Sequence, residues 1–398
     1  MHLIIHPRLL SGSITVIPSK SQAHRLLICA AFADSETKLI CPETNRDIEA
    51  TAACLRALGA DISREKYGYR INPVSKLPAK AVLPCSDSGS TLRFLLPVVG
   101  ALGITADFLL EGRLAQRPLS PLWEEMHRMG CSLFFTASNI LTCEGKLISG
   151  KYRIDGGVSS QFITGLLFAS ALISGTNHIH ITGTLESRPY VDMTLQALGM
   201  FGCNAEDLTI SGGSRLHSPG TLAVEGDWSN GAFFLAAKQL GSRLTVDNLS
   251  NNSLQGDRAA AELIPGLQKH HTISAADIPD LIPILSVVAA CHDGAVFTDI
   301  RRLRLKESDR VESVISMIHA LGGQAEATDN TLTIHGTGLL GGTVDCVNDH
   351  RIAMSAAIAA TVCTEPVILL GAQCVEKSYP KFFEEYHRLG GNYEQYIR

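Results

Sequence analysis

The sequence lacks the cysteine and histidine patterns that would indicate disulfides or a metal site. Its 11 cysteines are odd in number, scattered, and include no C-x-x-C pair, which argues against a disulfide framework and a zinc knuckle. The 14 histidines show no H-E-x-x-H or comparable ligand spacing. We therefore expect small buried cysteines in a reducing cytoplasm, and no bound metal.

The chain also lacks a membrane-length apolar run, a leader pattern and an excess of basic charge. Its apolar stretches, such as 162–174 and 281–291, are shorter than the ~20 residues of a spanning helix. The first residues show no basic region followed by a long apolar block, so we expect no signal peptide. Lys and Arg number 34 against 39 Asp and Glu, which argues against non-specific nucleic-acid binding. We expect a cytoplasmic protein that binds neither membrane nor nucleic acid.

What the sequence does contain is an internal repeat. With 398 residues, 45% of them apolar, the chain is long enough for two or three domains. One kind of segment recurs: a small or acidic residue opens a long apolar stretch of helical character that ends near a turn. Its starts lie 50 to 72 residues apart, at Ser19, Ser88, Ser159, Asp227, Asp277 and Asp349.

A second segment, an amphipathic helix that ends at glycine before a strand, keeps a similar spacing. Glycine after a periodic run is a helix C-cap signal because it accepts the left-handed conformation. Each repeat therefore predicts strand–helix–strand–helix–strand, and six repeats predict two pseudo-symmetric halves of three units each. The alternative is that any βα protein shows helices at rough intervals. The glycines are Gly59, Gly130, Gly199, Gly322 and Gly390, with Gly266 a weaker member.

The apolar helices predict an anion-binding arrangement. They are hydrophobic nearly all round, so we expect them to be buried. Their N-termini carry Ser, Asp or Gly beside cations, and a helix N-terminus offers free N–H groups and partial positive charge. If three such helices per domain point the same way, their N-termini give each domain a surface of positive potential. Two such surfaces facing each other would bind an anionic ligand.

The first apolar helix carries cations at its N-terminus. Lys20 and Ser21 fall in its first turn, and Arg25 follows about one turn later. Cations there oppose the helix dipole at a cost of ~0.3–1 kcal/mol each, which is tolerable if an anion fills the site. A solvated cap with exposed cations is the alternative.

Asp280 lies inside the apolar stretch DIPDLIPILSVVAA, where a carboxylate is costly unless it is paired or used. We expect burial to raise its pKa toward the range of a general base. The alternative is that Asp277 or Asp280 is an ordinary N-cap.

The densest charge run, 301–310, holds five cations and two acids. Lys306 and Arg310 are four residues apart on an expected helix and, with Glu307, could share a ligand. A bare charge run is otherwise typical of a solvated face.

Further polar positions open helices or occupy loops, where capping or solvation is the alternative role. They are Gly89, Arg113, Arg117, Ser159, Ser160, Gln161, Ser187, Tyr190, Arg351 and Lys377.

Taken together and in order, the motifs resemble those of a known family. The chain is similar to the EPSP synthases (3-phosphoshikimate 1-carboxyvinyltransferases), within the enolpyruvyl transferases, from Pro18 to Phe383. KESDR, NDHR and SSQF in combination are the specific part of this resemblance. The motifs are PSKSQAHR, SGSTLR, EGRLAQRP, SSQF, SRPY, IPD, LRLKESDR, NDHR and EKSYPKFF.

The resemblance implies an α/β (α+β) fold of two domains that close like a clam, each of three βαβαββ units with buried parallel helices. The domains would be 1–18 plus 226–398, and 19–225. It implies that the 5-hydroxyl of shikimate 3-phosphate attacks C2 of phosphoenolpyruvate while C3 is protonated, and that phosphate then leaves. No cofactor would be needed, and we expect a monomer.

The resemblance also implies residue roles. Asp280 would act as base toward the hydroxyl, and Glu307 as acid at C3, helped by Lys20. Phosphoenolpyruvate would be held by Lys20, Gly89, Arg117, Gln161, Arg310, Arg351 and Lys377. Shikimate 3-phosphate would be held by Lys20, Ser21, Arg25, Ser159, Ser160, Gln161, Ser187, Asp280 and Lys306, with Tyr190 packing nearby.

Some positions depart from the family pattern. Arg302 stands where many members have Asn, Asp87-Ser88 replaces a common Asn-Ala, and Phe94 replaces a frequent Pro. The nearest rival is the sister family that acts on UDP-N-acetylglucosamine, which usually carries a reactive Cys in the loop that is 112–118 here; this loop has none. A non-catalytic anion-binding protein on the same scaffold is the other alternative.

Overall fold

The computed structural model describes residues 1–395 and divides the chain into two compact units. Unit 1 comprises Met1–Ile17 and the chain from Gly226 onward, and unit 2 comprises Pro18–Glu225. Each unit buries a hydrophobic cluster of its own, so each can be understood by itself.

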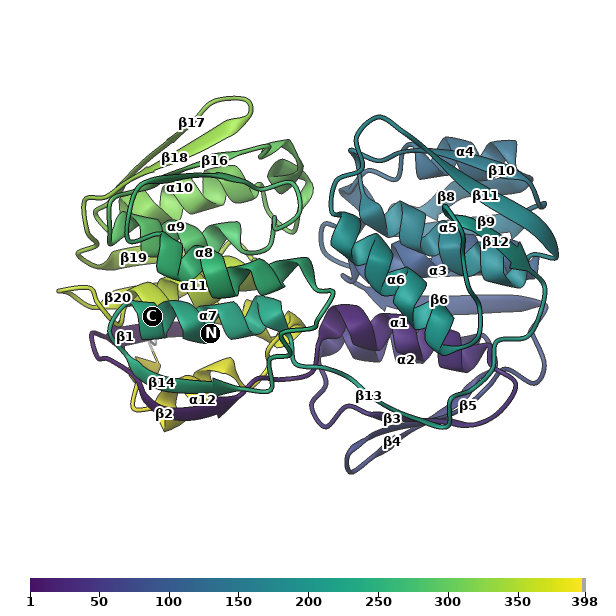
Figure 1. Cartoon of the computed structure of the whole chain (residues 1–398), viewed down its shortest axis with the longest axis horizontal. Coiled ribbons are helices and arrows are strands. Elements are labelled where there is room, and N and C mark those ends of the chain that lie inside the picture. Colours follow the sequence, from purple (N-terminus) through teal and green to yellow (C-terminus); the bar gives the residue numbers. More distant parts are fainter. Residues whose placement is uncertain (396–398) are drawn as a thin grey trace. The chain divides into compact units, whose positions relative to one another are not determined.

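Unit 2 is built from six helices and three sheets (Figure 1). The strands are ordered β13-β3-β5-β4, β6-β7-β9-β8 and β10-β11-β12. The helices are α1 (Lys20–Ala31), α2 (Arg46–Ala57), α3 (Gly89–Leu102), α4 (Leu122–Arg128), α5 (Ser160–Leu172) and α6 (Arg188–Met200). The strands are β3 (Thr37–Ile40), β4 (Asp61–Glu65), β5 (Gly68–Asn72), β6 (Lys80–Ser86), β7 (Thr105–Leu110), β8 (Cys131–Ala137), β9 (Ile140–Gly145), β10 (Lys151–Asp155), β11 (Gly175–Thr182), β12 (Thr209–Gly212) and β13 (Thr221–Ala223).

Unit 1 repeats this plan with sheets ordered β14-β2, β15-β16-β18-β17 and β19-β20-β1-β21. In Figure 1 the purple β1 lies beside the yellow β20, because the first strand pairs with both β20 and β21. The helices are α7 (Trp228–Gln239), α8 (Ala260–Gly266), α9 (Ile282–Ala290), α10 (Arg310–Ala320), α11 (His350–Ala359) and α12 (Phe382–Arg388). The strands are β1 (His2–His6), β2 (Ser11–Thr15), β14 (Arg243–Asp247), β15 (His271–Ser274), β16 (Ala295–Thr298), β17 (Gln324–Ala327), β18 (Thr331–His335), β19 (Gly342–Asp345), β20 (Val367–Leu370) and β21 (Asn392–Gln395).

Across the part of the chain that the structure describes, each of the six sheets contains one parallel pair of strands. Parallel neighbours require a crossover, and a buried helix supplies it. In five sheets that helix lies between the paired strands in the sequence: α3, α5, α7, α9 or α11. The sixth helix, α1, precedes β3, whose parallel partner β13 comes from the end of the unit. The six-fold repeat predicted from the sequence is therefore confirmed.

Five of the six predicted helix starts are also confirmed, because their side chains accept a backbone N–H of the first turn; they are Ser19, Ser88, Ser159, Asp227 and Asp349. The sixth was wrong. Leu281 is the N-cap of α9, without a side-chain cap bond, so neither Asp277 nor Asp280 caps this helix.

The glycine C-caps are confirmed at four of six positions, where φ is positive: Gly59, Gly130, Gly322 and Gly390. Two were wrong. Gly199 lies inside α6, and Gly202 takes the positive φ just beyond that helix. Gly266 is the last residue of α8.

The helix α9 shows why these repeats hold together, since all nine of its residues are buried. We expect Leu285→Ala, at a fully buried position, to lower the free energy of unfolding by about 2–5 kcal/mol, because it leaves a cavity. Urea unfolding followed by circular dichroism measures this. The control is Leu340→Ala, where the side chain is 58% exposed; equal midpoints for the two variants would contradict the assignment.

Candidate functional site

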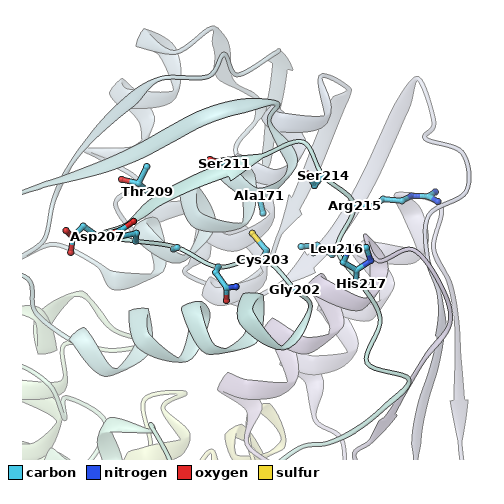
Figure 2. A pocket seen from close by; sticks show the side chains of 13 residues that line it. Ala171, Gly202, Cys203, Asp207, Thr209, Ser211, Ser214, Arg215, Leu216 and His217 are labelled. Atoms are coloured by element: carbon cyan, nitrogen blue, oxygen red, sulfur yellow. The ribbon is translucent and has the colours of Figure 1, made fainter.

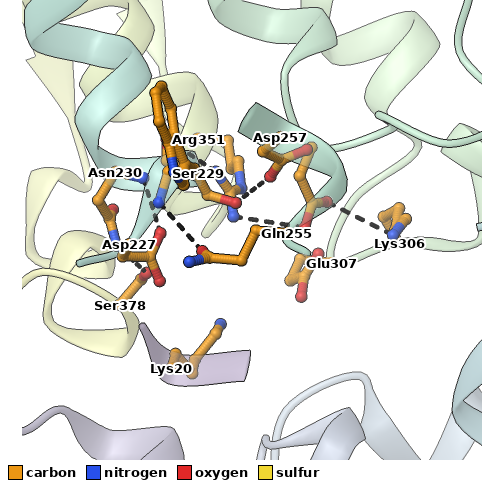
Figure 3. A network of polar contacts seen from close by, with 12 residues as sticks. Lys20, Asp227, Ser229, Asn230, Gln255, Asp257, Lys306, Glu307, Arg351 and Ser378 are labelled. Atoms are coloured by element: carbon orange, nitrogen blue, oxygen red, sulfur yellow. Dashed lines mark hydrogen bonds and ion pairs between the residues drawn. The ribbon is translucent and has the colours of Figure 1, made fainter. Parts of the chain in front are cut away.

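In unit 1 the first turns of four helices gather around one carboxylate, Asp280, which lies just before α9. Figure 3 shows Lys306 and Arg351 from this group. Arg310, the first residue of α10, donates from Nη1 to Asp280 Oδ1 at 2.5 Å. Arg351, from the first turn of α11, donates from Nη2 to Oδ2 at 3.3 Å, and Lys306 Nζ lies 3.4 Å from Oδ1. The first turn of α7 joins this group, because Arg351 Nη1 lies 3.5 Å from the Ser229 carbonyl oxygen.

Arg310 is the centre of the charge balance. Its guanidinium is 1% exposed and contacts three carboxylates: Asp280, Glu307 at 2.7 Å and Asp349 at 2.9 Å. Burial lowers the pKa of Arg310, but these carboxylates raise it by more, so it remains protonated. Asp349 also caps α11, which links the charge cluster to the fold.

The cations around Asp280 decide its ionisation. Burial raises the pKa of this carboxyl, but Lys306, Arg351 and Arg310 lower it by more, and the result lies well below the usual range. The pKa of Lys306 falls to about 8, mainly because burial disfavours its charge.

Two expectations for this region were therefore wrong. The pKa of Asp280 is lowered rather than raised, because three cations outweigh burial. Lys306 and Arg310 do not share a helix: Lys306 follows a short 3-10 helix, Arg301–Leu305, and α10 begins only at Arg310. They converge all the same, on Asp280.

Lys377 ends the short 3-10 helix Ala372–Lys377 and is buried. The next residue, Ser378, accepts a hydrogen bond from Asn230 Nδ2 in the first turn of α7 at 3.3 Å. The structure therefore brings the Lys377 segment to the same end of unit 1 as Asp280.

In unit 2 the first turns of α1, α2, α3 and α5 gather in a corresponding way. Lys20 Nζ lies 2.9 Å from Asp47 Oδ2, so a carboxylate of α2 compensates the cation that opposes the α1 dipole. Behind them, the buried His24 shares a hydrogen bond of 2.7 Å with Thr51, which shares another of 2.7 Å with Thr91 of α3. Burial lowers the pKa of His24 to about 3, so this ring is neutral at physiological pH.

Gly89 lies between two guanidinium groups. A Cβ atom at this position would lie 2.6 Å from Arg117 Nη1 and 2.7 Å from Arg93 Nη1. Gln161 connects the neighbouring helices, because its Oε1 accepts from Arg93 Nη1 at 3.1 Å and its Nε2 donates to Ser90 Oγ at 3.0 Å. The structure thus brings Gly89, Arg117 and Gln161 together, as a donor-rich corner at the start of α3 and α5.

Arg25 is buried in unit 2, and its guanidinium group donates hydrogen bonds to neighbouring helices. Its Nη1 donates to the Ser21 carbonyl at 2.6 Å, its Nη2 to the Tyr190 carbonyl at 2.8 Å, and its Nε to the Thr194 hydroxyl at 2.9 Å. These bonds place Ser21 and Tyr190 beside Arg25. Ser187 adopts a left-handed backbone at the start of α6, φ 55°, and is buried. Ser159 and Ser160 open α5.

Sequence reasoning missed three charged members of these clusters: Asp47, Arg93 and Asp257. Arg93 ends the SGSTLR motif and lies about one turn into α3. This position could have identified it as a member of the site from the sequence. Asp47 opens α2 as an ordinary acidic first-turn residue, and nothing in the sequence links it to Lys20.

A cavity of about 730 Å³ lies elsewhere in unit 2, at the end of α6 and the loop after β12 (Figure 2). It contains none of the predicted site residues. Its charged lining residues are Glu206, Asp207 and Arg215, and His217 also lines it.

Within residues 1–395, no group of three or more His, Cys, Asp and Glu side chains could hold a metal ion. None of the helices in that range combines the length and apolarity of a membrane span.

Comparison with known proteins places the chain in a family. A family model for EPSP synthase (3-phosphoshikimate 1-carboxyvinyltransferase) matches residues 5–386. The 3-phosphoshikimate 1-carboxyvinyltransferase of Clostridium kluyveri is 37% identical over 421 residues, and the match covers 99% of each chain. That of Clostridioides difficile is 34% identical, covering 99% of this chain and 98% of the other.

The structural comparison supports the fold. A solved structure of EPSP synthase from Acinetobacter baumannii matches with a TM-score of 0.81 over 99% of both chains, at 23% sequence identity. This confirms the enolpyruvyl transferase fold predicted from the motifs, and the sequence matches confirm the family resemblance. The chain belongs to the EPSP synthase, or 3-phosphoshikimate 1-carboxyvinyltransferase, family.

Proposed function

We propose that this protein transfers the enolpyruvyl group of phosphoenolpyruvate to the 5-hydroxyl of shikimate 3-phosphate. The hydroxyl loses its proton as its oxygen forms a bond to C2 and C3 gains a proton. The resulting tetrahedral intermediate then loses phosphate and one proton from C3 to give the enolpyruvyl ether. The family match over residues 5–386 supports the activity. The observation that carries the mechanism is the position of the Asp280 carboxylate, which contacts the partly buried Lys306 and the buried Arg310 and Arg351.

This charge arrangement suits two anionic substrates. Each carries a phosphate and a carboxylate, and two unit charges ~4 Å apart interact with ~4 kcal/mol at an effective dielectric near 20. In unit 1 the proposed binding cations are Lys306, Arg310, Arg351 and Lys377. In unit 2 the proposed binding groups are Lys20, Ser21, Arg25, Gly89, Arg117, Ser159, Ser160, Gln161, Ser187 and Tyr190.

Asp280 is the proposed base and Glu307 the proposed acid at C3, helped by Lys20. The low pKa of Asp280 keeps it ionised but makes it a weak base. An anion that binds beside the same cations reduces the positive field at Asp280, so substrate binding raises its basicity when the hydroxyl is in place.

We propose that the chain acts as a monomer in the cytoplasm, with the two compact units as its two domains. The separate hydrophobic core of each unit supports this, because neither unit relies on a second copy for burial.

Phosphate release tests the activity directly. We expect release when phosphoenolpyruvate is supplied with shikimate 3-phosphate, and none with UDP-N-acetylglucosamine, because the loop 112–118 lacks cysteine. Release with the nucleotide sugar alone would favour the sister activity. Binding of phosphoenolpyruvate and shikimate 3-phosphate without release would indicate an anion-binding protein.

Asp280→Ala tests the proposed base. We expect kcat to fall about 10²–10⁴-fold while shikimate 3-phosphate still binds, since the proton acceptor is lost but the cations remain. Steady-state kinetics and calorimetric titration measure the two properties. Asp329→Asn, at an exposed turn of unit 1, is the control. Turnover like that of the unchanged protein would remove Asp280 from the mechanism.

Gly89→Ala tests the donor-rich corner of unit 2. The added methyl group must displace both Arg117 and Arg93, so we expect kcat/KM for phosphoenolpyruvate to fall roughly 10- to 100-fold. Gly199→Ala is a matched control, because its added Cβ would meet only Asn204 at 3.5 Å. An equal effect of the two substitutions would contradict the role of Gly89.

A further inference from the structure

Asp257 is a buried carboxylate in unit 1 to which the proposed reaction assigns no role. It is the second residue of the short 3-10 helix η2 (Gly256–Ala259) and is 1% exposed. A carboxylate is rarely buried to this degree unless the surrounding structure uses it. Its neighbours show what that use is.

The segment around Asp257 holds the start of α7. Asp257 Oδ2 accepts a hydrogen bond from the Ser229 hydroxyl. Two residues earlier, Gln255 Nε2 donates to the Gly226 carbonyl at 2.8 Å, and its Oε1 accepts from the Trp228 backbone N–H at 3.0 Å. Two of these bonds hold the first turn of α7, and the third holds the residue before its N-cap, so one short segment fixes the start of the helix. Figure 3 shows Asp257 and Gln255 beside Ser229.

That first turn leads directly to the proposed base. The Ser229 carbonyl lies 3.5 Å from Arg351 Nη1, and Nη2 of the same guanidinium lies 3.3 Å from Asp280 Oδ2. Arg351 is buried, which by itself lowers the pKa of its guanidinium group, whereas the negative charges of both Asp280 and Asp257 raise it. A change at Asp257 therefore reaches Asp280 through Ser229 and Arg351.

We propose that Asp257 is a positioning residue for the reaction: through Ser229 it fixes the first turn of α7, and through Arg351 it orients and balances the carboxylate of Asp280. This inference rests on the proposed function, because it assigns Asp257 a role in supporting the proposed base. Asp257 itself does not touch substrate in this account.

The groups facing Asp257 make its charge sensitive to pH. Burial raises its pKa to about 6; Asp280 and Asp227 also raise it, whereas Arg351 and the Ser229 hydrogen bond lower it. Above pH 6 the ionised Asp257 balances Arg351, and below pH 6 it gains a proton and this balance is lost. The Asp257→Asn variant is neutral at every pH and so mimics the protonated form.

Kinetics over pH 5 to 9 test the role in turnover. We expect kcat of the unchanged protein to fall below about pH 6. We expect Asp257→Asn to abolish this fall and to lower kcat about tenfold at pH 8, with KM for phosphoenolpyruvate changed less. Asp329→Asn is the matched control. Full activity of Asp257→Asn at pH 8 would overturn the proposal. So would a fall in kcat below about pH 6 that persists in this variant.

A second readout does not depend on turnover. The chain has two tryptophans, and Trp228 is buried in the first turn of α7 beside Ser229. In a Trp123→Phe background, Trp228 fluorescence should change with a midpoint near pH 6, and Asp257→Asn should abolish this transition. A transition that persists in Asp257→Asn would overturn the proposal. If the unchanged protein shows the transition but releases no phosphate, the proposed function fails while the link from Asp257 to α7 stands.

Ser229→Ala keeps the test decisive if Asp257→Asn does not fold. It preserves the carboxylate but removes a hydrogen bond that lowers the pKa of Asp257, so we expect the fluorescence midpoint to move to higher pH. A midpoint that stays in place, or moves to lower pH, would overturn the link through Ser229.

Discussion

The structure depends on the compensation of buried positive charge at helix N-termini. Arg310 and Arg351 are buried in the first turns of α10 and α11, where the helix dipole opposes them. Carboxylates make this possible, with Asp280 and Asp349 pairing directly with Arg310. Removing one partner of such a buried pair typically costs about 3–5 kcal/mol, because the other charge is left uncompensated. The same carboxylates set the electrostatics on which the proposed chemistry relies.

Unit 2 meets the same constraint with different groups. Asp47 compensates Lys20 at the start of α1, whereas Arg25 is satisfied by two backbone carbonyls and a hydroxyl. Neutral hydroxyls and a neutral His24 then connect the helices behind these cations. Unit 2 therefore holds Arg25 with neutral oxygens, whereas unit 1 surrounds Arg310 with carboxylates.

The sequence predicted the repeat well because the signals of each repeat are local. Ser or Asp caps and Leu-Gly ends act within one or two turns, so they can be read from neighbouring residues. The missed start of α9 has a local cause as well, since Pro283 occupies its first turn and no side chain caps it.

The ionisation of the site could not be predicted in the same way. The cations that lower the pKa of Asp280 come from positions 306, 310 and 351, and only the fold brings them to it. Asp47 and Asp257 were missed for the same reason, since their partners Lys20 and Ser229 are 27 and 28 residues away. Motif resemblance located the substrate-binding candidates but could not show how their charges offset one another.

The most direct test of this account is the pKa of the Asp280 carboxyl, measured by carbon NMR of aspartate-labelled protein with Asp280→Asn for assignment. The account predicts a pKa well below the ordinary value of ~3.9 in the free protein, and a rise when shikimate 3-phosphate binds. An ordinary pKa that does not respond to the ligand would contradict it, because the cations would then be neither close to Asp280 nor shared with the substrate.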